Sequence, residues 1–145
     1  MLEVTEIYKS VQGESTYIGL PCVFVRLTGC NLRCVWCDTT HAFHNGKDLS
    51  IGQIVEQVKS YGVNLVEITG GEPLLQKEVF PLMESLLANK FQVMLETSGS
   101  LPIKNVPKEV VKILDLKCPG SGEENKNLWE NLNHLASTDE IKFVI

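Results

Sequence analysis

The stretch that decides the fold of this chain is GCNLRCVWCD at residues 29–38, in which Cys30, Cys34 and Cys37 have the spacing C-x-x-x-C-x-x-C. It follows directly on CVFVRLT at residues 22–28, an apolar run rich in β-branched residues that predicts a strand. A short loop with this spacing can direct three sulfur atoms toward one centre. The stretch therefore predicts a metal-binding loop at the carboxyl end of a strand.

Three thiolates in one loop are compatible with two kinds of metal centre. An iron–sulfur cubane normally has four thiolate ligands, so three of them leave one iron open to a small molecule. A structural zinc site would need a fourth ligand, which His41 or His44 could supply. The spacing alone leaves both centres open, and the zinc site would make the chain a non-catalytic metal-binding module.

The remaining cysteines need no such chemistry. The chain has five cysteines, an odd number that argues against a closed set of disulfides. Cys22 lies in the apolar run before the loop, where a free cysteine acts as a small hydrophobic residue. Cys118 lies beside Pro119, and we expect it to be structural as well.

Length and charge limit the function classes. The chain has 145 residues, enough for one core, and we expect a single domain over residues 1–145. A formal net charge of −5 disfavours a general nucleic-acid-binding surface. No apolar run approaches the roughly 18 residues of a membrane span, and the N-terminus lacks the layout of a signal peptide. We therefore expect a cytoplasmic protein that binds neither nucleic acid nor a membrane.

Short apolar runs alternate with helical patterns along the chain, which predicts an α/β fold with a mostly parallel sheet. One helix follows Ser50, with Gln53 placed to complete a capping box, a second follows Pro73, and a third surrounds Leu132. The strands are expected at 4–8, 22–28, 65–69, 92–96, 111–116 and 141–145. No helix follows the last run to cover it, and we expect the sequence to be truncated at the C-terminus.

The cysteine loop, with Trp36 just before its last cysteine, resembles the signature of the radical S-adenosylmethionine (SAM) enzymes. A second motif agrees, because TGGEP at residues 69–73 resembles their glycine-rich motif and lies at the end of a predicted strand. Glycines there would bring backbone groups close to a ligand. The resemblance implies a partial, open βα barrel of about six mostly parallel strands. It also implies a [4Fe–4S] cluster on Cys30, Cys34 and Cys37, with SAM bound to the open iron.

The N-terminal segment narrows the resemblance to one family. SVQGES at residues 10–15 and FVRLTGC at 24–30 are similar to the QGEG and F-V-R-x-x-G-C patterns of the 7-carboxy-7-deazaguanine synthases, with Ser15 in place of the second glycine. The resemblance continues through ETSG at 96–99 to the end of the chain. It implies a ring-contracting lyase of queuosine and deazapurine biosynthesis. Such an enzyme converts 6-carboxy-5,6,7,8-tetrahydropterin to 7-carboxy-7-deazaguanine with loss of ammonia.

The same resemblance implies roles for individual residues. Substrate contacts fall to Val11, Gln12, Gly13, Arg26 and Thr69, cofactor contacts to Gly71, Asp115, Leu116, Lys117, Lys142, Phe143, Val144 and Ile145, and Mg²⁺ binding to Thr39. Asp115 and Leu116 depart from the family's S-P-K pattern, whereas Lys117 keeps it. The resemblance further implies a homodimer and an electron donor such as flavodoxin or ferredoxin.

Two of these roles make chemical sense by themselves. An amide such as Gln12 can read a guanine-like edge, and Arg26 can pair with a carboxylate. Among enzymes the alternative is a glycyl-radical activase, which shares GCNLRC and the small size. An activase would need a protein partner bearing a glycine loop, and the QGE segment favours the pterin enzyme.

Overall fold

A computed structural model describes all 145 residues. Seven strands form one sheet in the order β3-β1-β2-β4-β5-β6-β7. The strands are β1 Leu2–Val11, β2 Pro21–Leu27, β3 Lys47–Leu49, β4 Leu65–Gly70, β5 Gln92–Thr97, β6 Val111–Leu116 and β7 Glu140–Phe143. The pairs from β2 to β7 are parallel, while β1 is antiparallel to both of its neighbours. The predicted open, mostly parallel α/β architecture is confirmed.

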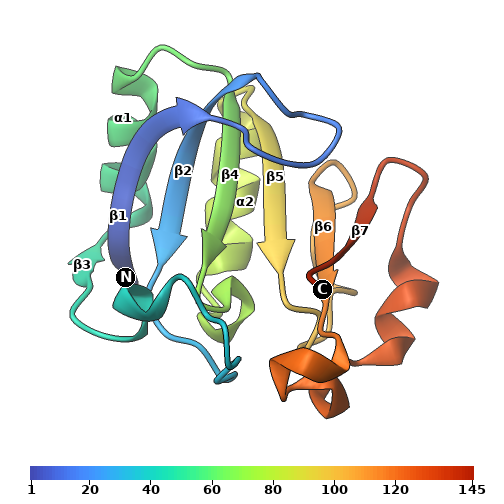
Figure 1. Ribbon diagram of the computed structural model, residues 1–145. Helices are drawn as coiled ribbons and strands as arrows, with labels where there is room; N and C mark the ends of the chain where they lie inside the picture. The colour runs from blue at the N-terminus through green and yellow to red at the C-terminus, as the bar shows by residue number, and fades with distance from the viewer.

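The two α-helices cover one face of this sheet (Figure 1). They are α1 Ile51–Ser60 and α2 Val79–Ala88. Helix α1 begins with the predicted capping box, in which the Ser50 hydroxyl accepts from the Gln53 amide and the Gln53 side chain accepts from the Ser50 amide. The apolar sides of both helices join the inward residues of the strands in a core of 22 buried residues. That core holds the sheet in place.

The opposite face of the same strands changes character along their length. Side chains alternate between the two faces of a strand, so every second residue points away from the helices. Near the strand starts these residues form a small apolar cluster, Cys22, Leu65, Met94, Val111 and Ile113. Nearer the carboxyl ends they are Arg26, Glu67, Thr69, Glu96 and Asp115, which all line one cavity. The sheet therefore presents its polar residues where its parallel strands end.

One predicted helix starts later in the structure, and one strand was not predicted. The helix expected right after Pro73 is preceded by a short 3₁₀ turn, Pro73–Leu75, and the α-helix starts at Val79, because the Glu72 side chain accepts from the Leu74 amide and caps a separate turn. A third strand, β3, was not predicted, since it has only three residues and two of them are polar. It pairs with the start of β1.

The third predicted helix is wrong in type. The segment Trp129–His134 is a 3₁₀ helix rather than an α-helix. Asn131, which is 1% exposed, donates to the carbonyls of Gly99 and Leu101 and accepts from the Ile103 amide. This anchoring to the loop after β5 fixes the segment in short turns, whereas sequence periodicity reports only apolar spacing. No helix of the molecule combines the length and apolar character needed to cross a membrane.

Candidate active site

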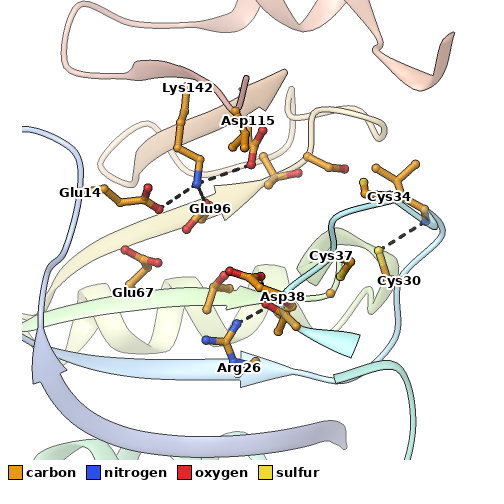
Figure 2. A pocket seen from close by; sticks show the side chains of 18 of the residues that line it. Glu14, Arg26, Cys30, Cys34, Cys37, Asp38, Glu67, Glu96, Asp115 and Lys142 are labelled. Atoms are coloured by element: carbon orange, nitrogen blue, oxygen red, sulfur yellow. Dashed lines mark hydrogen bonds and ion pairs between the residues drawn. The ribbon is translucent and has the colours of Figure 1, made fainter. Parts of the chain in front are cut away.

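A cavity of about 550 Å³ opens at the carboxyl ends of the parallel strands. It brings together the cysteine loop, the QGE segment, the glycine turn after β4 and charged residues of β5, β6 and β7 (Figure 2). These segments are far apart in the sequence. They meet because parallel strands place all their carboxyl ends at one edge of the sheet.

The cysteine loop is held by backbone contacts on both sides. At its start Gly29 has a φ of +96°, a conformation that favours glycine, and its amide donates to the Ala42 carbonyl at 2.8 Å. Further on, the Val35 amide donates to the Ser121 carbonyl at 3.0 Å, and the Arg33 amide to Glu123 at 2.7 Å. The loop after β6, which contains Ser121 and Glu123, therefore fixes the cysteine loop.

The glycine turn after β4 packs directly against the cysteine loop. A Cβ on Gly71 would lie 2.2 Å from the Gly29 carbonyl oxygen and 2.6 Å from the Cβ of Cys30. The next amide, of Glu72, donates to that same Gly29 carbonyl at 2.8 Å. One role of the glycine motif is thus close packing of the two loops, beside any contact with a ligand.

The Glu72 side chain fastens this turn to the end of β5. It is fully buried and accepts hydrogen bonds from the hydroxyls of Thr97 and Ser98 and from the Ser98 amide. Burial raises the pKa of the Glu72 carboxyl, while the hydrogen bonds from Ser98 and Leu74 act in the opposite direction. Because its oxygens are occupied by the protein, Glu72 is a structural residue.

The donor set of the loop fits a cubane better than a zinc ion. A zinc site needs four ligands converging on one point, yet no three His, Cys, Asp or Glu side chains of the chain do so. His41 pairs with Glu6 at 3.4 Å, and neither His41 nor His44 lines the cavity, whereas all three cysteines do. A cubane does not require its three cysteine sulfurs to converge on one atom, because each sulfur binds a different iron. Cys30, Cys34 and Cys37, which all line the cavity, therefore fit as three ligands that would hold a [4Fe–4S] cluster.

On β2, Arg26 is held as a cation with donors to spare. Its Nε donates to Glu6 at 2.8 Å, and its two Nη atoms donate to the Tyr8 hydroxyl at 3.3 Å and the Gly70 carbonyl at 3.4 Å. Burial works against the charge, but the hydrogen bonds that Arg26 donates to Glu6 and Tyr8 raise the pKa of Arg26 above its ordinary value. A guanidinium has five N–H donors, so one N–H remains on each Nη. Two such parallel donors suit a carboxylate.

An ion-pair cluster closes the opposite wall (Figure 2). Lys142 of β7 contacts Glu14 at 2.8 Å, Asp115 at 3.5 Å, and Glu96. Although burial opposes it, the carboxylates of Glu96 and Glu14 raise the pKa of Lys142. Lys117 pairs with Asp115 at 3.1 Å, yet Asp115 Oδ1 is buried without a partner. That oxygen is free to accept a hydrogen bond from a ligand.

At the bottom of the cavity a carboxyl group and an amide meet. Glu67 of β4 accepts from Gln12 Nε2 at 2.5 Å, and the two side chains come from residues that are 4% and 3% exposed. Burial, together with the facing carboxyl of Glu96, raises the pKa of Glu67 to about 8. The surroundings of Glu67 therefore favour its neutral form.

Comparison with known proteins agrees with this geometry. The sequence model of the Radical SAM superfamily matches residues 24–117, which include the cysteine loop and the glycine turn. A 7-carboxy-7-deazaguanine synthase of Thermoplasma acidophilum is 37% identical over 98% of this chain and 69% of that protein. The chain belongs to the 7-carboxy-7-deazaguanine synthase family of radical SAM proteins. Membership in the superfamily implies a [4Fe–4S] cluster and SAM as cofactors.

Two further members of the synthase family support the assignment. The 7-carboxy-7-deazaguanine synthase of Koribacter versatilis is 55% identical over 99% of this chain and 65% of that protein. The crystal structure of QueE from Escherichia coli superposes with a TM-score of 0.82 at 26% identity, covering 99% of this chain and 71% of that one. The chain thus spans about two thirds of the length of these proteins. Their names are those of the synthase and not of a glycyl-radical activase.

Most residues that the synthase resemblance singled out meet in the cavity. Those lining it are Gln12, Gly13, Arg26, Cys30, Cys34, Cys37, Thr39, Thr69, Gly71, Asp115, Lys117, Lys142 and Val144. Val11, Leu116, Phe143 and Ile145 do not line it. Leu116 is buried in the core against the helices, and the side chains of the other three are more than half exposed.

Sequence reasoning assigned no role to four acidic residues of the cavity, Glu14, Asp38, Glu67 and Glu96. A signal for Glu67 was present, because a charged residue interrupts the apolar strand LVEITG, and charged side chains are rarely buried without a partner. The sequence could not reveal that Glu96 and Gln12 face it, since these contacts join segments 29 and 55 residues away.

Proposed function

We propose that this chain carries the activity of its family: conversion of 6-carboxy-5,6,7,8-tetrahydropterin to 7-carboxy-7-deazaguanine with loss of ammonia. The observation that carries the proposal is the composition of one cavity. A three-cysteine loop suited to a cubane, a cation with two free N–H donors, and the Gln12 amide lie around about 550 Å³ at the carboxyl edge of the sheet. A carboxylated pterin matches the last two features.

The cysteine loop and the glycine turn would hold the cofactors. Bound together, the cluster and SAM supply a reductively generated carbon radical able to remove a hydrogen atom from the substrate. Cys30, Cys34 and Cys37 leave one iron free for the methionine part of SAM. Contacts to SAM would come from Gly71, from Val144, and from the free oxygen of Asp115 between Lys117 and Lys142.

The substrate would lie between Arg26 and the cavity floor. Arg26 would pair with its 6-carboxylate, while Gln12, Gly13 and Thr69 would contact the ring. The residues of the cavity would hold the reacting carbon of the substrate close to the radical source, which fixes their relative orientation. They would also exclude water.

Magnesium would assist at Thr39. The Thr39 hydroxyl donates to Asp38 at 2.6 Å, and both residues line the cavity, so a hydroxyl and a carboxylate stand ready as oxygen ligands. Mg²⁺ prefers such ligands and keeps waters or substrate oxygens as well. A cation there would balance the negative charge of a carboxylated substrate. An external one-electron donor and a homodimer belong to the same proposal.

The decisive experiment is an anaerobic assay. The protein is reconstituted with iron and sulfide and given SAM, Mg²⁺, a reductant and 6-carboxy-5,6,7,8-tetrahydropterin, and the products are separated by liquid chromatography with mass detection. We expect 7-carboxy-7-deazaguanine and ammonia in equal amounts. Cleavage of SAM without any deazaguanine would overturn the proposal.

Arg26 offers a matched check on the substrate's position. Arg26→Lys keeps the charge but loses the paired donors, so KM for the pterin should rise roughly tenfold or more with a smaller change in kcat. Lys9→Arg, at an exposed position of β1, serves as the control. An unchanged KM in Arg26→Lys would show that the carboxylate lies elsewhere.

A further inference from the structure

Glu67 has no part in the proposed function, yet it occupies the centre of the cavity floor. It lies in the middle of β4, between Leu65 of the small apolar cluster and Thr69 of the cavity wall, on the face away from the helices. Leaving a carboxyl group at such a buried place costs free energy unless its oxygens are used. The contacts of Glu67 indicate what it is used for.

The first contact fixes the amide of Gln12. The Gln12 backbone is held on both sides, because its amide donates to the Leu20 carbonyl at 2.9 Å and its carbonyl accepts from the Gly19 amide at 2.8 Å. Its side-chain Nε2 donates to Glu67 at 2.5 Å and lies 3.5 Å from Cys22 Sγ. The nitrogen side of the amide is thus committed to the protein.

The oxygen side of the same amide is left for a ligand. No group of the protein donates to Gln12 Oε1. Gln12 lines the cavity, and an amide group is planar with its oxygen opposite its nitrogen. The Glu67 oxygen that faces Gln12 accepts from Nε2 whether the carboxyl is ionised or has its proton on the other oxygen, toward Glu96. In both forms Glu67 prevents the amide from turning its nitrogen toward the cavity.

The second contact of Glu67 is with the carboxyl group of Glu96. The Glu67 carboxyl faces that of Glu96, whose own charge is balanced by Lys142 (Figure 2). A neutral Glu67 can accept from Gln12 on one oxygen and donate its proton toward Glu96 with the other. The other groups near Glu67 are Cys22 on β2, which is buried, and Glu14 in the loop after β1. None of them offers the cavity floor a free N–H donor.

We propose that Glu67 is a specificity-determining positioning residue: it holds the Gln12 carbonyl toward the cavity, so that the floor accepts N–H groups and selects a ring edge that carries an amino group. This inference rests on the proposed function and deepens it by naming the recognised edge. The 2-amino-4-oxo edge of a pterin donates N–H groups there. An analogue with oxygen in place of the amino group would set one carbonyl oxygen against another, which is disfavoured.

The test compares the binding of two fluorescent probes to the reconstituted, SAM-loaded protein under anaerobic conditions. The probes are 6-carboxypterin and 6-carboxylumazine, which have an amino and an oxo group, respectively, at position 2. We expect wild-type protein to bind the pterin roughly 100-fold more tightly. In Glu67→Gln the new amide can donate to Gln12 and let it turn, so the preference should fall to about tenfold or less.

Glu67→Val and Glu14→Gln complete the design. Glu67→Val removes the fixing group without offering a donor and should also reduce the preference. Glu14→Gln changes a carboxylate of the same cavity that does not touch Gln12, so both affinities should move together and their ratio should stay. A general structural defect would weaken the binding of both probes alike. The proposal concerns the ratio of the two affinities.

Each outcome decides one question. If both Glu67 variants keep the wild-type ratio, Glu67 does not determine specificity, although the proposed function stands. If wild-type protein binds neither probe and forms no deazaguanine, the proposed function fails and this inference fails with it. If wild-type protein binds both probes equally, the floor does not read the amino group and the inference is overturned alone.

Discussion

The two faces of the sheet show how differently one set of strands can be used. Toward the helices, the alternate residues of β2, β4, β5 and β6 are buried, and most of them are apolar members of the main core. Away from the helices, the residues change from apolar at the strand starts to charged at the carboxyl ends. One face stabilises the fold, and the other carries the chemistry at a single edge. Substitutions on the helix face should therefore mainly lower stability, whereas substitutions on the cavity face should mainly impair binding and activity.

The largest expected effect is the loss of one cluster ligand. Cys34→Ala should abolish iron-dependent absorbance near 400 nm and reduce turnover by a factor on the order of 1,000 or more, because a cluster with two thiolates is not held. Folding should be little changed, since Cys34 belongs to a partly exposed loop. Iron analysis and circular dichroism measure the two quantities. Normal iron content would contradict the ligand assignment.

Neighbouring residues of β4 offer the sharpest contrast between the faces. Ile68 is fully buried against the helices, and Ile68→Ala should lower the free energy of unfolding by about 2–5 kcal/mol. Thr69→Ala, on the cavity face, should cost less than about 1 kcal/mol but should raise KM for the pterin. Urea denaturation and steady-state kinetics test both. An equal loss of stability in the two variants would contradict the conclusion that the helix face stabilises the fold and the cavity face does not.

The next effect tests the close contact between the two loops. Gly71→Ala would place its Cβ against the backbone of Gly29, and the loops would have to move apart, at a cost of about 1–3 kcal/mol and with poorer cluster incorporation. Gly52→Ala is the matched control, because its Cβ would meet only the Ser50 hydroxyl, at 3.9 Å. In helix α1 that change should stabilise by roughly 0.5–1 kcal/mol. Identical behaviour of the two variants would refute the packing role of Gly71.

The last effect is a change in the pH dependence of stability. The pKa of Glu67 is about 8 in the folded protein, whereas an ordinary glutamate, as in the unfolded chain, has a pKa of 4.5. Between pH 4.5 and about 8 the folded state therefore binds more protons than the unfolded state. Glu67 therefore makes stability fall as pH rises from about 4.5 to about 8. Glu67→Gln does not titrate, and its stability relative to wild type should increase steadily over this range. Urea denaturation at pH 5, 6, 7 and 8 measures the difference; parallel curves would argue against a buried neutral carboxyl group.

The sequence by itself determined the parts of this protein that depend on residues close in the chain. The alternation of apolar runs predicted the parallel sheet, and Ser50 with Gln53 predicted the start of helix α1. The spacing of Cys30, Cys34 and Cys37 predicted a metal-binding loop at the end of β2. Local order suffices for these because spacing, periodicity and capping act within a few residues.

Contacts between residues that are far apart in the chain became visible in the tertiary structure. Asn131 binds a loop about 30 residues away and makes a 3₁₀ helix where apolar spacing predicted an α-helix. Lys142 joins Glu14, Glu96 and Asp115, and Glu67 meets a Gln12 that is 55 residues away. The sequence carries each of these side chains, but which of them face one another follows from the strand order. The strand order is set by the packing of the whole sheet against its helices.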